Sequence, residues 1–301
     1  MSGAVHAEPT RIDERSGSGG LKFWFSVTGA LVLLAVIYAQ PFREMVRNWG
    51  LVDSYYSHGY LIVPICLYLV WLKRDDLARV PRDSSPLGYL FIIGSSAFLL
   101  LGSFLGFVVF QQFSIVPMLA GISLVFLGKK QTKVLWFPIV FLLFMIPMPG
   151  SVTQSIVFDL KMLAAGLSVR LAQLMTLPMI HDGSYIRFKN DALLIGNVCG
   201  GLRSLIALLA IGTLMAYFSQ SRSWARWLVL LLSGPIAIAA NVFRIFILCI
   251  VAYFWGSGFA GGTFHEVSGL FIFGIAFVLF FFMETTLRRV APTGSSVEAG
   301  S

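Results

Sequence analysis

Residues 224–255 read WARWLVLLLSGPIAIAANVFRIFILCIVAYFW, an apolar stretch that decides the fold class. A helix needs about 20 apolar residues to span the hydrocarbon core of a bilayer, so this stretch is longer than one span requires. It contains Gly234 and Pro235 and, further on, the polar pair Asn241 and Arg244. We therefore expect a membrane helix that is kinked at the proline or broken into two pieces.

Seven other stretches are apolar enough to cross a membrane. They are 23–39, 55–72, 87–106, 108–127, 134–147, 200–218 and 264–287. The whole chain of 301 residues is 57% hydrophobic and 12% charged, whereas about a quarter of the residues in an ordinary soluble domain are charged. This composition excludes a conventional soluble enzyme and predicts an all-α fold, a polytopic membrane bundle of about eight transmembrane helices.

Lys and Arg residues cluster at the ends of alternate apolar stretches, which is the pattern of cytoplasmic connections. This pattern predicts that both termini are cytosolic. We expect residues 1–21 to be a disordered cytosolic tail, residues 22–287 the membrane domain and residues 288–301 a second cytosolic tail. The formal net charge of +8 comes from these scattered clusters, so it does not indicate a nucleic-acid-binding protein.

The connection 148–198 is predicted to lie on the outer side of the membrane. Its first half, 151–177, has apolar residues at helical spacing with polar residues interleaved, which favours a small extracytoplasmic helix at the membrane interface. Its second half contains SYIRFKNDALLIGN, in which apolar and polar residues alternate around Lys189-Asn190-Asp191, and predicts a β-hairpin. Connections this long are usually functional, and this one leads directly to Cys199.

The three cysteines have no spacing typical of a disulfide framework or a zinc site, and no cofactor or metal is implied. Cys66 and Cys249 lie among aliphatic residues and are expected to be buried hydrophobic side chains. Cys199 lies in NVCGGLRSL, where a polar segment becomes a membrane helix.

The sequence around Cys199 suits a reactive thiol as well as a buried one. Gly200 and Gly201 remove side-chain bulk, so that a substrate backbone can approach the sulfur. A thiol at the N-terminus of a helix has a lowered pKa, and Arg203, one turn further, is expected to lower it more.

Two later stretches contain polar residues beside apolar ones. Arg244 lies inside a predicted span, where a charged residue usually marks function, although it can also snorkel to the interface. Asn241 lies on the same helical face and can hold the guanidinium or a substrate backbone. His265, followed by Glu266, opens the last span, and Gly269 one turn further allows another helix to pack closely there. The alternative for His265 is ordinary packing at an interface.

The predicted orientation places Cys199, Arg244 and His265 at the outer side of the membrane. A thiol with a nearby imidazole is an activated nucleophile, and the imidazole can later protonate a leaving amine. An arginine at the same depth can stabilise the oxyanion of a tetrahedral intermediate. Together these residues predict cysteine peptidase chemistry.

The motifs NVCGGLRSL, NVFRIF and FHEVSG, in this order, resemble those of the exosortase/archaeosortase family of membrane cysteine transpeptidases. The earlier YYSHGYLIVPICLYLVWLKR is similar to the second-span signature of that family, and the resemblance runs from about Tyr55 to about Met283. It implies Cys199 as nucleophile, Arg244 as the second catalytic residue, and His265 at a position where bacterial members have a histidine.

The resemblance also implies the substrates, the location and the process served. Substrates would be exported proteins that end in a short motif such as Pro-Glu-Pro, a hydrophobic helix and a basic tail. Cleavage would take place at the outer face of the bacterial inner membrane, among the lipids, with transfer to an unknown acceptor and a link to exopolysaccharide or biofilm matrix.

Several assignments stay open at this level. His58, in the segment SHG, is a candidate for packing or for orienting a substrate. Arg187 and Lys189 can recognise a glutamate of the sorting motif or simply form a solvated turn. The alternative functions are a transporter, in which Asn241 and Arg244 would line an anion pathway, and a non-catalytic assembly factor of a polysaccharide export system.

Overall fold

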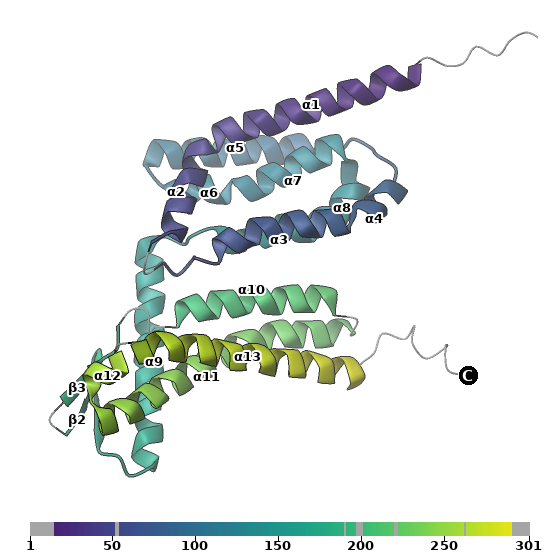
Figure 1. Ribbon diagram of the computed structural model, residues 1–301. Coiled ribbons are helices and arrows are strands. Elements are labelled where there is room, and N and C mark those ends of the chain that lie inside the picture. The colour runs from purple at the N-terminus through teal and green to yellow at the C-terminus, as the bar shows by residue number, and fades with distance from the viewer. Residues whose placement is uncertain are drawn as a thin grey trace, which may run out of the picture. The chain divides into compact units, whose positions relative to one another are not determined.

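The computed structural model describes residues 15–51, 54–189, 191–196, 201–219, 222–261 and 263–290. The chain is mostly helical and contains one small β-sheet (Figure 1). Its helices form two compact units, the first made of Met1–Glu44 and Leu69–Val140, the second of Met45–Tyr68 and Phe141–Ser301. Three helices have residues in both units: α2 (Ala39–Trp49), α3 (Gly59–Leu72) and α8 (Gly128–Phe141).

The first unit is built around two closely packed helices. Besides α1 (Arg15–Ile37) and α4 (Arg74–Arg79), it contains α5 (Leu87–Leu105), α6 (Val108–Phe113) and α7 (Ile115–Phe126). A Cβ atom added to Gly88 of α5 would lie 2.6 Å from the carbonyl oxygen of Gly121 of α7. The two helices therefore touch through their backbones, as is common where small residues meet in membrane proteins.

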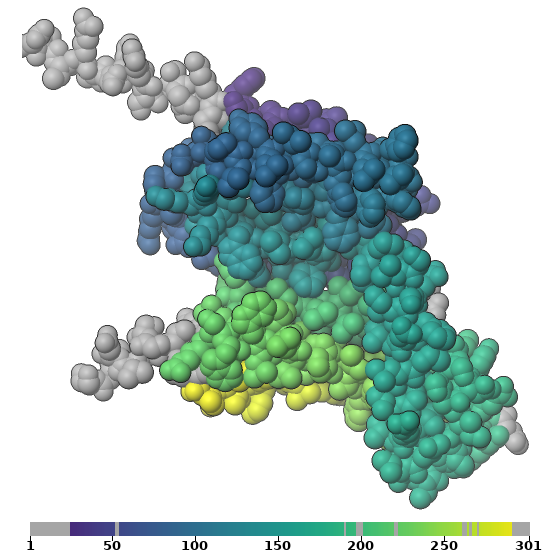
Figure 2. Space-filling view, turned by 180° about the vertical axis from the view of Figure 1, so that it is seen from behind, coloured from purple at the N-terminus to yellow at the C-terminus, as the bar shows by residue number. Residues whose placement is uncertain are grey.

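The second unit contains the candidate functional motifs. After η1 (Leu142–Met145) come α9 (Gly150–Leu174), the strands β1 (Met179–Asp182), β2 (Tyr185–Phe188) and β3 (Asp191–Leu194), and then α10 (Leu202–Phe218), α11 (Ser223–Trp255), α12 (Ser257–Gly261) and α13 (Thr263–Val290). Helix α11 packs against α9, α10 and α13 (Figure 1). In the space-filling view α9 and the sheet form one continuous teal surface beside the green of α10 and α11 (Figure 2).

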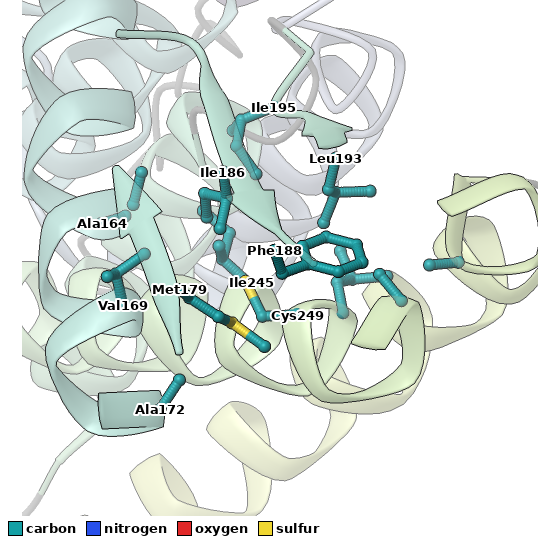
Figure 3. Close-up of a cluster of buried hydrophobic side chains, with 14 of the residues drawn as sticks. Ala164, Val169, Ala172, Met179, Ile186, Phe188, Leu193, Ile195, Ile245 and Cys249 are labelled. Carbon is teal, nitrogen blue, oxygen red and sulfur yellow. The ribbon is translucent and has the colours of Figure 1, made fainter. Parts of the chain in front are cut away.

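The core of this unit lies between α9, the sheet and α11 (Figure 3). Met179, Ile186 and Phe188 of the sheet are buried against Ile245 and Cys249 of α11. The three strands are antiparallel in the order β1-β2-β3. Because alternate side chains of a strand point to one face, the sheet covers α11 with its apolar face and leaves the other face open.

A buried hydrogen bond also joins α9 to α11. The hydroxyl of Ser168, which is fully buried, donates to the carbonyl oxygens of Ala164 (2.7 Å) and of Val242 (2.8 Å). Since Val242 follows Asn241, this bond fixes the part of α11 that carries the polar pair.

The protein is a polytopic membrane protein, but the expected number of eight spans is not confirmed. Among the described residues, four helical segments are long and apolar enough to cross a membrane, and up to six if two bent pairs each form one span. One of these pairs is α8 with η1 followed by α9, which turns through 80°. Two further apolar helices, α3 and α10, have fewer than 18 residues and are not among these candidates.

Two sequence-based expectations differ from the structure, and for α11 one of two alternatives is excluded. Helix α11 is continuous from Ser223 to Trp255 with Pro235 inside it, so it is not broken into two pieces, and a kink at the proline stays a prediction. Helix α1 begins at Arg15, inside the stretch expected to be a disordered tail. The expected two-stranded hairpin is part of a three-stranded sheet, because β1 adds a strand that the sequence analysis did not predict.

The contact between α5 and α7 generates a stability prediction. Alanine usually stabilises a helix by about 1 kcal/mol relative to glycine, but at Gly88 its Cβ would overlap the Gly121 carbonyl. We expect Gly88→Ala to lower the free energy of unfolding by about 1–3 kcal/mol, the usual cost of overpacking. Gly94→Ala, on the same helix with nothing within 4 Å of the added Cβ, is the control and should be neutral or stabilising. Thermal unfolding in detergent measures both, and equal midpoints would contradict the close contact.

Candidate active site

Helix α10 begins directly after the motif that carries the predicted nucleophile. Cys199 and Gly200 lie outside the described residues. Gly201 is the N-cap of α10 with a φ of 74°, a left-handed conformation that glycine adopts without strain. Its carbonyl accepts hydrogen bonds from the backbone N–H of Leu205 (2.8 Å) and the hydroxyl of Ser204 (2.9 Å). Helix α10 therefore begins two residues after Cys199, at a cap held by two hydrogen bonds.

The side chain of Asn241 presses against this helix start. A Cβ atom on Gly201 would lie 2.5 Å from Cγ and 2.6 Å from Nδ2 of Asn241, which is closer than any real side chain allows. Asn241 is 5% exposed, so its amide is inside the bundle. Glycine at position 201 thus permits both the left-handed turn and the contact between α10 and α11.

One turn further along α11, Arg244 lies against the last helix. A Cβ atom on Gly269 of α13 would lie 2.9 Å from Nη2 and 3.0 Å from Cζ of Arg244. The space that Gly269 leaves open is therefore occupied by the guanidinium of a neighbouring helix. Gly269 follows His265 by one helical turn, while the side chains of His265 and Glu266 lie outside what the structure describes.

These two contacts bring the neighbourhoods of the three motifs together on one stretch of α11. Asn241 touches the start of α10, two residues from Cys199, and Arg244 touches α13 one turn from His265. An amide that donates hydrogen bonds and a cationic guanidinium are groups that can stabilise a negatively charged oxygen. The arrangement is chemically suited to a reaction in which an oxyanion forms near the start of α10.

Arg203 fastens the first turn of α10 to a preceding segment. Its Nε donates a hydrogen bond of 2.7 Å to the carbonyl oxygen of Ser54. The residues that follow Ser54 form the segment YYSHG, which the sequence analysis singled out. The effect of Arg203 on the pKa of Cys199 stays a prediction.

His58 is half-buried just before α3 and packs against the chain between η1 and α9. Its Nε2 donates to the carbonyl oxygen of Phe144 at 3.1 Å, and its Nδ1 is buried without a hydrogen-bond partner among the described residues. Burial lowers the pKa of His58, and the positive charge of Arg203 adds to this effect, while the hydrogen bond to Phe144 partly opposes it. The net lowering of the pKa favours the neutral form of the ring.

Two aromatic side chains near His58 also form hydrogen bonds to the backbone of residues 145–148, which were not expected from the sequence. Trp49 Nε1 donates to the carbonyl oxygen of Met145 (2.9 Å), and the hydroxyl of Tyr56 accepts from the backbone N–H of Met148 (3.1 Å). The motif YYSHGY was noticed in the sequence, but its contact with residues 144–148 is a long-range one that no local pattern indicates. This packing fixes the chain where α9 begins.

The charged residues of the sheet have partners within the protein. Arg187 Nε lies 2.7 Å from Oδ2 of Asp182, and the amine of Lys189 lies 4.0 Å from the ring centre of Tyr253 on α11. Asp191 accepts hydrogen bonds from the backbone and hydroxyl of Ser257, and these bonds lower the pKa of its carboxyl. The charges of the sheet attach it to the end of α11 and the start of α12.

A cavity of about 670 Å³ opens beside α9. Its lining includes one charged residue, Lys161, which is 7% exposed. The described lining residues are Tyr55, Ser151, Gln154, Ser155, Val157, Phe158 and Lys161. No sequence motif predicted this cavity, because its lining comes from two segments far apart in the chain.

The lowered pKa of His58 generates a prediction about pH. Below about pH 6.5, the pKa of an unfolded histidine, the unfolded chain binds more protons at this position than the folded protein. The stability contributed by the neutral ring is complete above that pH and is lost as the pH falls through the lower pKa of the folded state. We expect the thermal midpoint to fall between pH 7.5 and 5.5, and to fall less in His58→Gln, whose amide can still donate to Phe144. An identical fall in both proteins would contradict the neutral, buried ring.

Comparison with known proteins identifies a family for this chain. Residues 46–282 match the family model described as transmembrane exosortase (Exosortase_EpsH). The match spans all of the residues that form the candidate site. No curated protein and no solved structure matches the chain.

Proposed function

Because this chain belongs to the transmembrane exosortase family, we propose that it is a cysteine transpeptidase that cleaves the C-terminal sorting signals of exported proteins. The signal would consist of a Pro-Glu-Pro type motif, a hydrophobic helix and a basic tail. Cleavage would occur at the outer face of a bacterial inner membrane, with both termini of the enzyme in the cytosol. The product would serve the exopolysaccharide or biofilm matrix.

The observation that supports this proposal most strongly is the pair of contacts made by α11. Asn241 lies against Gly201 and Arg244 lies against Gly269, so that the segments carrying Cys199 and His265 both adjoin one polar stretch of an otherwise apolar helix. A charge inside a membrane bundle is costly and is retained where it has a function. A transporter would instead need polar groups along a continuous path through several spans.

The proposed reaction begins with the thiolate of Cys199. His265 takes the thiol proton, and the sulfur attacks the scissile carbonyl carbon to form a tetrahedral intermediate. The guanidinium of Arg244, assisted by the amide of Asn241, stabilises the oxyanion. The C–N bond then breaks, the leaving amine takes the proton from His265, and a thioester remains on Cys199. An acceptor nucleophile releases the acyl group and restores the thiol.

The hydrophobic helix of the substrate is proposed to arrive through the membrane. An apolar groove of about 540 Å³ lies between α9 and α11. Its residues include Val242 and Phe243, which directly follow Asn241. A segment in this groove would lie beside the proposed oxyanion site, and lateral entry suits a substrate whose own helix is in the bilayer.

The first test of the proposal is processing of a co-expressed reporter protein that ends in such a signal. We expect wild type to produce a shorter reporter and Cys199→Ala to produce none, because the variant lacks the thiol on which the thioester is proposed to form. Arg244→Lys should reduce the rate about 10²–10³-fold, since removing an oxyanion-stabilising group costs that much, while the protein still accumulates in the membrane. Cys249→Ala, at a buried cysteine of the core, is the thiol control and should retain processing.

The outcomes separate the alternatives. Processing by Cys199→Ala at the wild-type rate would disprove the mechanism. Solute uptake that survives Cys199→Ala but is lost in Arg244→Lys would indicate a transporter. Secretion of matrix that needs the protein but not the thiol would indicate an assembly factor.

A second test uses the glycine that adjoins Arg244. In Gly269→Ala the new methyl group would displace the guanidinium, which is the mobile end of a long side chain, so we expect a loss of activity of about tenfold or more with little loss of stability. Gly274→Ala, on the same helix with nothing within 4 Å of the added Cβ, is the matched control. Equal reporter processing by the two variants would contradict a role for the position of Arg244.

A further inference from the structure

We propose that the cavity beside α9 binds an acidic side chain of the substrate peptide, with Lys161 as the residue that recognises its carboxylate. This inference rests on the proposed function and adds to it the residue that selects the substrate. It concerns a side chain on α9, outside the three motifs.

Lys161 is unusually buried for a lysine. It is 7% exposed, whereas lysines are almost never this buried unless they are paired. Its amine lies 5.8 Å from the ring centre of Phe158, and no carboxylate of the described residues forms an ion pair with it. Burying an ammonium group without a negative partner is unfavourable. The geometry points to a negatively charged group, supplied by a bound ligand, as the partner of the Lys161 ammonium.

The cavity suits a peptide carboxylate better than an isolated ion. Ser151, Gln154 and Ser155 contribute hydroxyl and amide groups along one side of it, and Tyr55 and Phe158 contribute aromatic surface. A volume of about 670 Å³ accommodates several side chains. One cation matches one carboxylate, while aromatic surface suits the apolar residues that flank it. A phosphate group would instead favour several cations or an arginine.

Two connections place the cavity next to the candidate active site. Tyr55, in its wall, follows Ser54, whose carbonyl is bonded by Arg203 in the first turn of α10. On α9, Lys161 belongs to the same buried stripe as Ser168, which is bonded to Val242. Seven helical residues correspond to about 10 Å, and three residues of extended peptide cover the same distance. A short peptide segment can therefore reach from Lys161 to the level of Val242, which follows Asn241.

The test compares three reporter proteins whose signals contain Pro-Glu-Pro, Pro-Gln-Pro or Pro-Lys-Pro and are otherwise identical. Wild type should process the Glu reporter on the order of tenfold faster or more than the Gln reporter, because a charge-assisted hydrogen bond is lost with the carboxylate. Lys161→Met should process both at similar rates, and Lys161→Arg should keep the preference. Lys161→Glu should process the Lys reporter faster than the Glu reporter. Arg170→Met, at an exposed cation of the same helix, should behave as wild type.

Each failure has a distinct meaning. If wild type processes no reporter, or if Cys199→Ala processes them as well as wild type, the proposed function fails and this inference falls with it. If wild type is active but Lys161→Met keeps the preference for Glu, the inference alone is wrong. If Lys161→Met slows all reporters equally, the cavity binds a component common to all reactions, such as the phosphate of a lipid headgroup, and the peptide assignment is overturned.

Discussion

Helix α11 can present two polar side chains inside an apolar bundle only because glycines face them. Asn241 occupies the space where a side chain of residue 201 would be, and the guanidinium of Arg244 occupies the space beside Gly269. Any larger residue at either position would separate the helices or displace the polar group. The proposed chemistry depends on this constraint, since it determines how closely the segments next to Cys199 and His265 approach the polar groups of α11.

Helix α9 and the sheet, which lie between α8 and α10 in the sequence, pack against α11 and hold it in place. Helix α9 is bonded to α11 through Ser168, and the sheet buries Met179, Ile186 and Phe188 against the C-terminal half of α11. The charges of the sheet bind Tyr253 and Ser257 at the end of that helix. Cavities in proteins usually form where rigid elements meet, and here α9 supplies most of the cavity while Arg203 connects its wall to α10.

Much of this organisation could be predicted from local sequence. Long apolar stretches with few charges indicate a helical membrane protein, and a small residue one turn after His265 indicated a close helix contact. Gly201 was expected to give access to the sulfur, whereas the structure shows that it also makes room for Asn241. The catalytic roles of Cys199, Arg244 and His265 remain predictions drawn from the motifs.

Other features could not be predicted, for identifiable reasons. Pro235 predicted a kink or a break in α11, and the break is absent because a membrane helix tolerates a proline where neighbouring groups compensate for the lost hydrogen bond. Strand β1 could not be predicted from alternation, because its residues MIHD do not alternate between apolar and polar, and only the two-residue loop Gly183-Ser184 indicates a hairpin there. The burial of Lys161 arises from packing between distant segments, and its spacing on α9 alone is that of an amphipathic interfacial helix.

In the proposed reaction, an acyl group is transferred through a thioester on Cys199. Hydroxylamine cleaves thioesters to hydroxamates, so the purified enzyme should be incubated with a reporter and increasing hydroxylamine, and the new C-terminus of the product analysed by mass spectrometry. We predict a hydroxamate whose fraction rises with hydroxylamine concentration in wild type and that is absent in Cys199→Ala. A product that carries a free carboxylate at every concentration, formed at an unchanged rate, would contradict it.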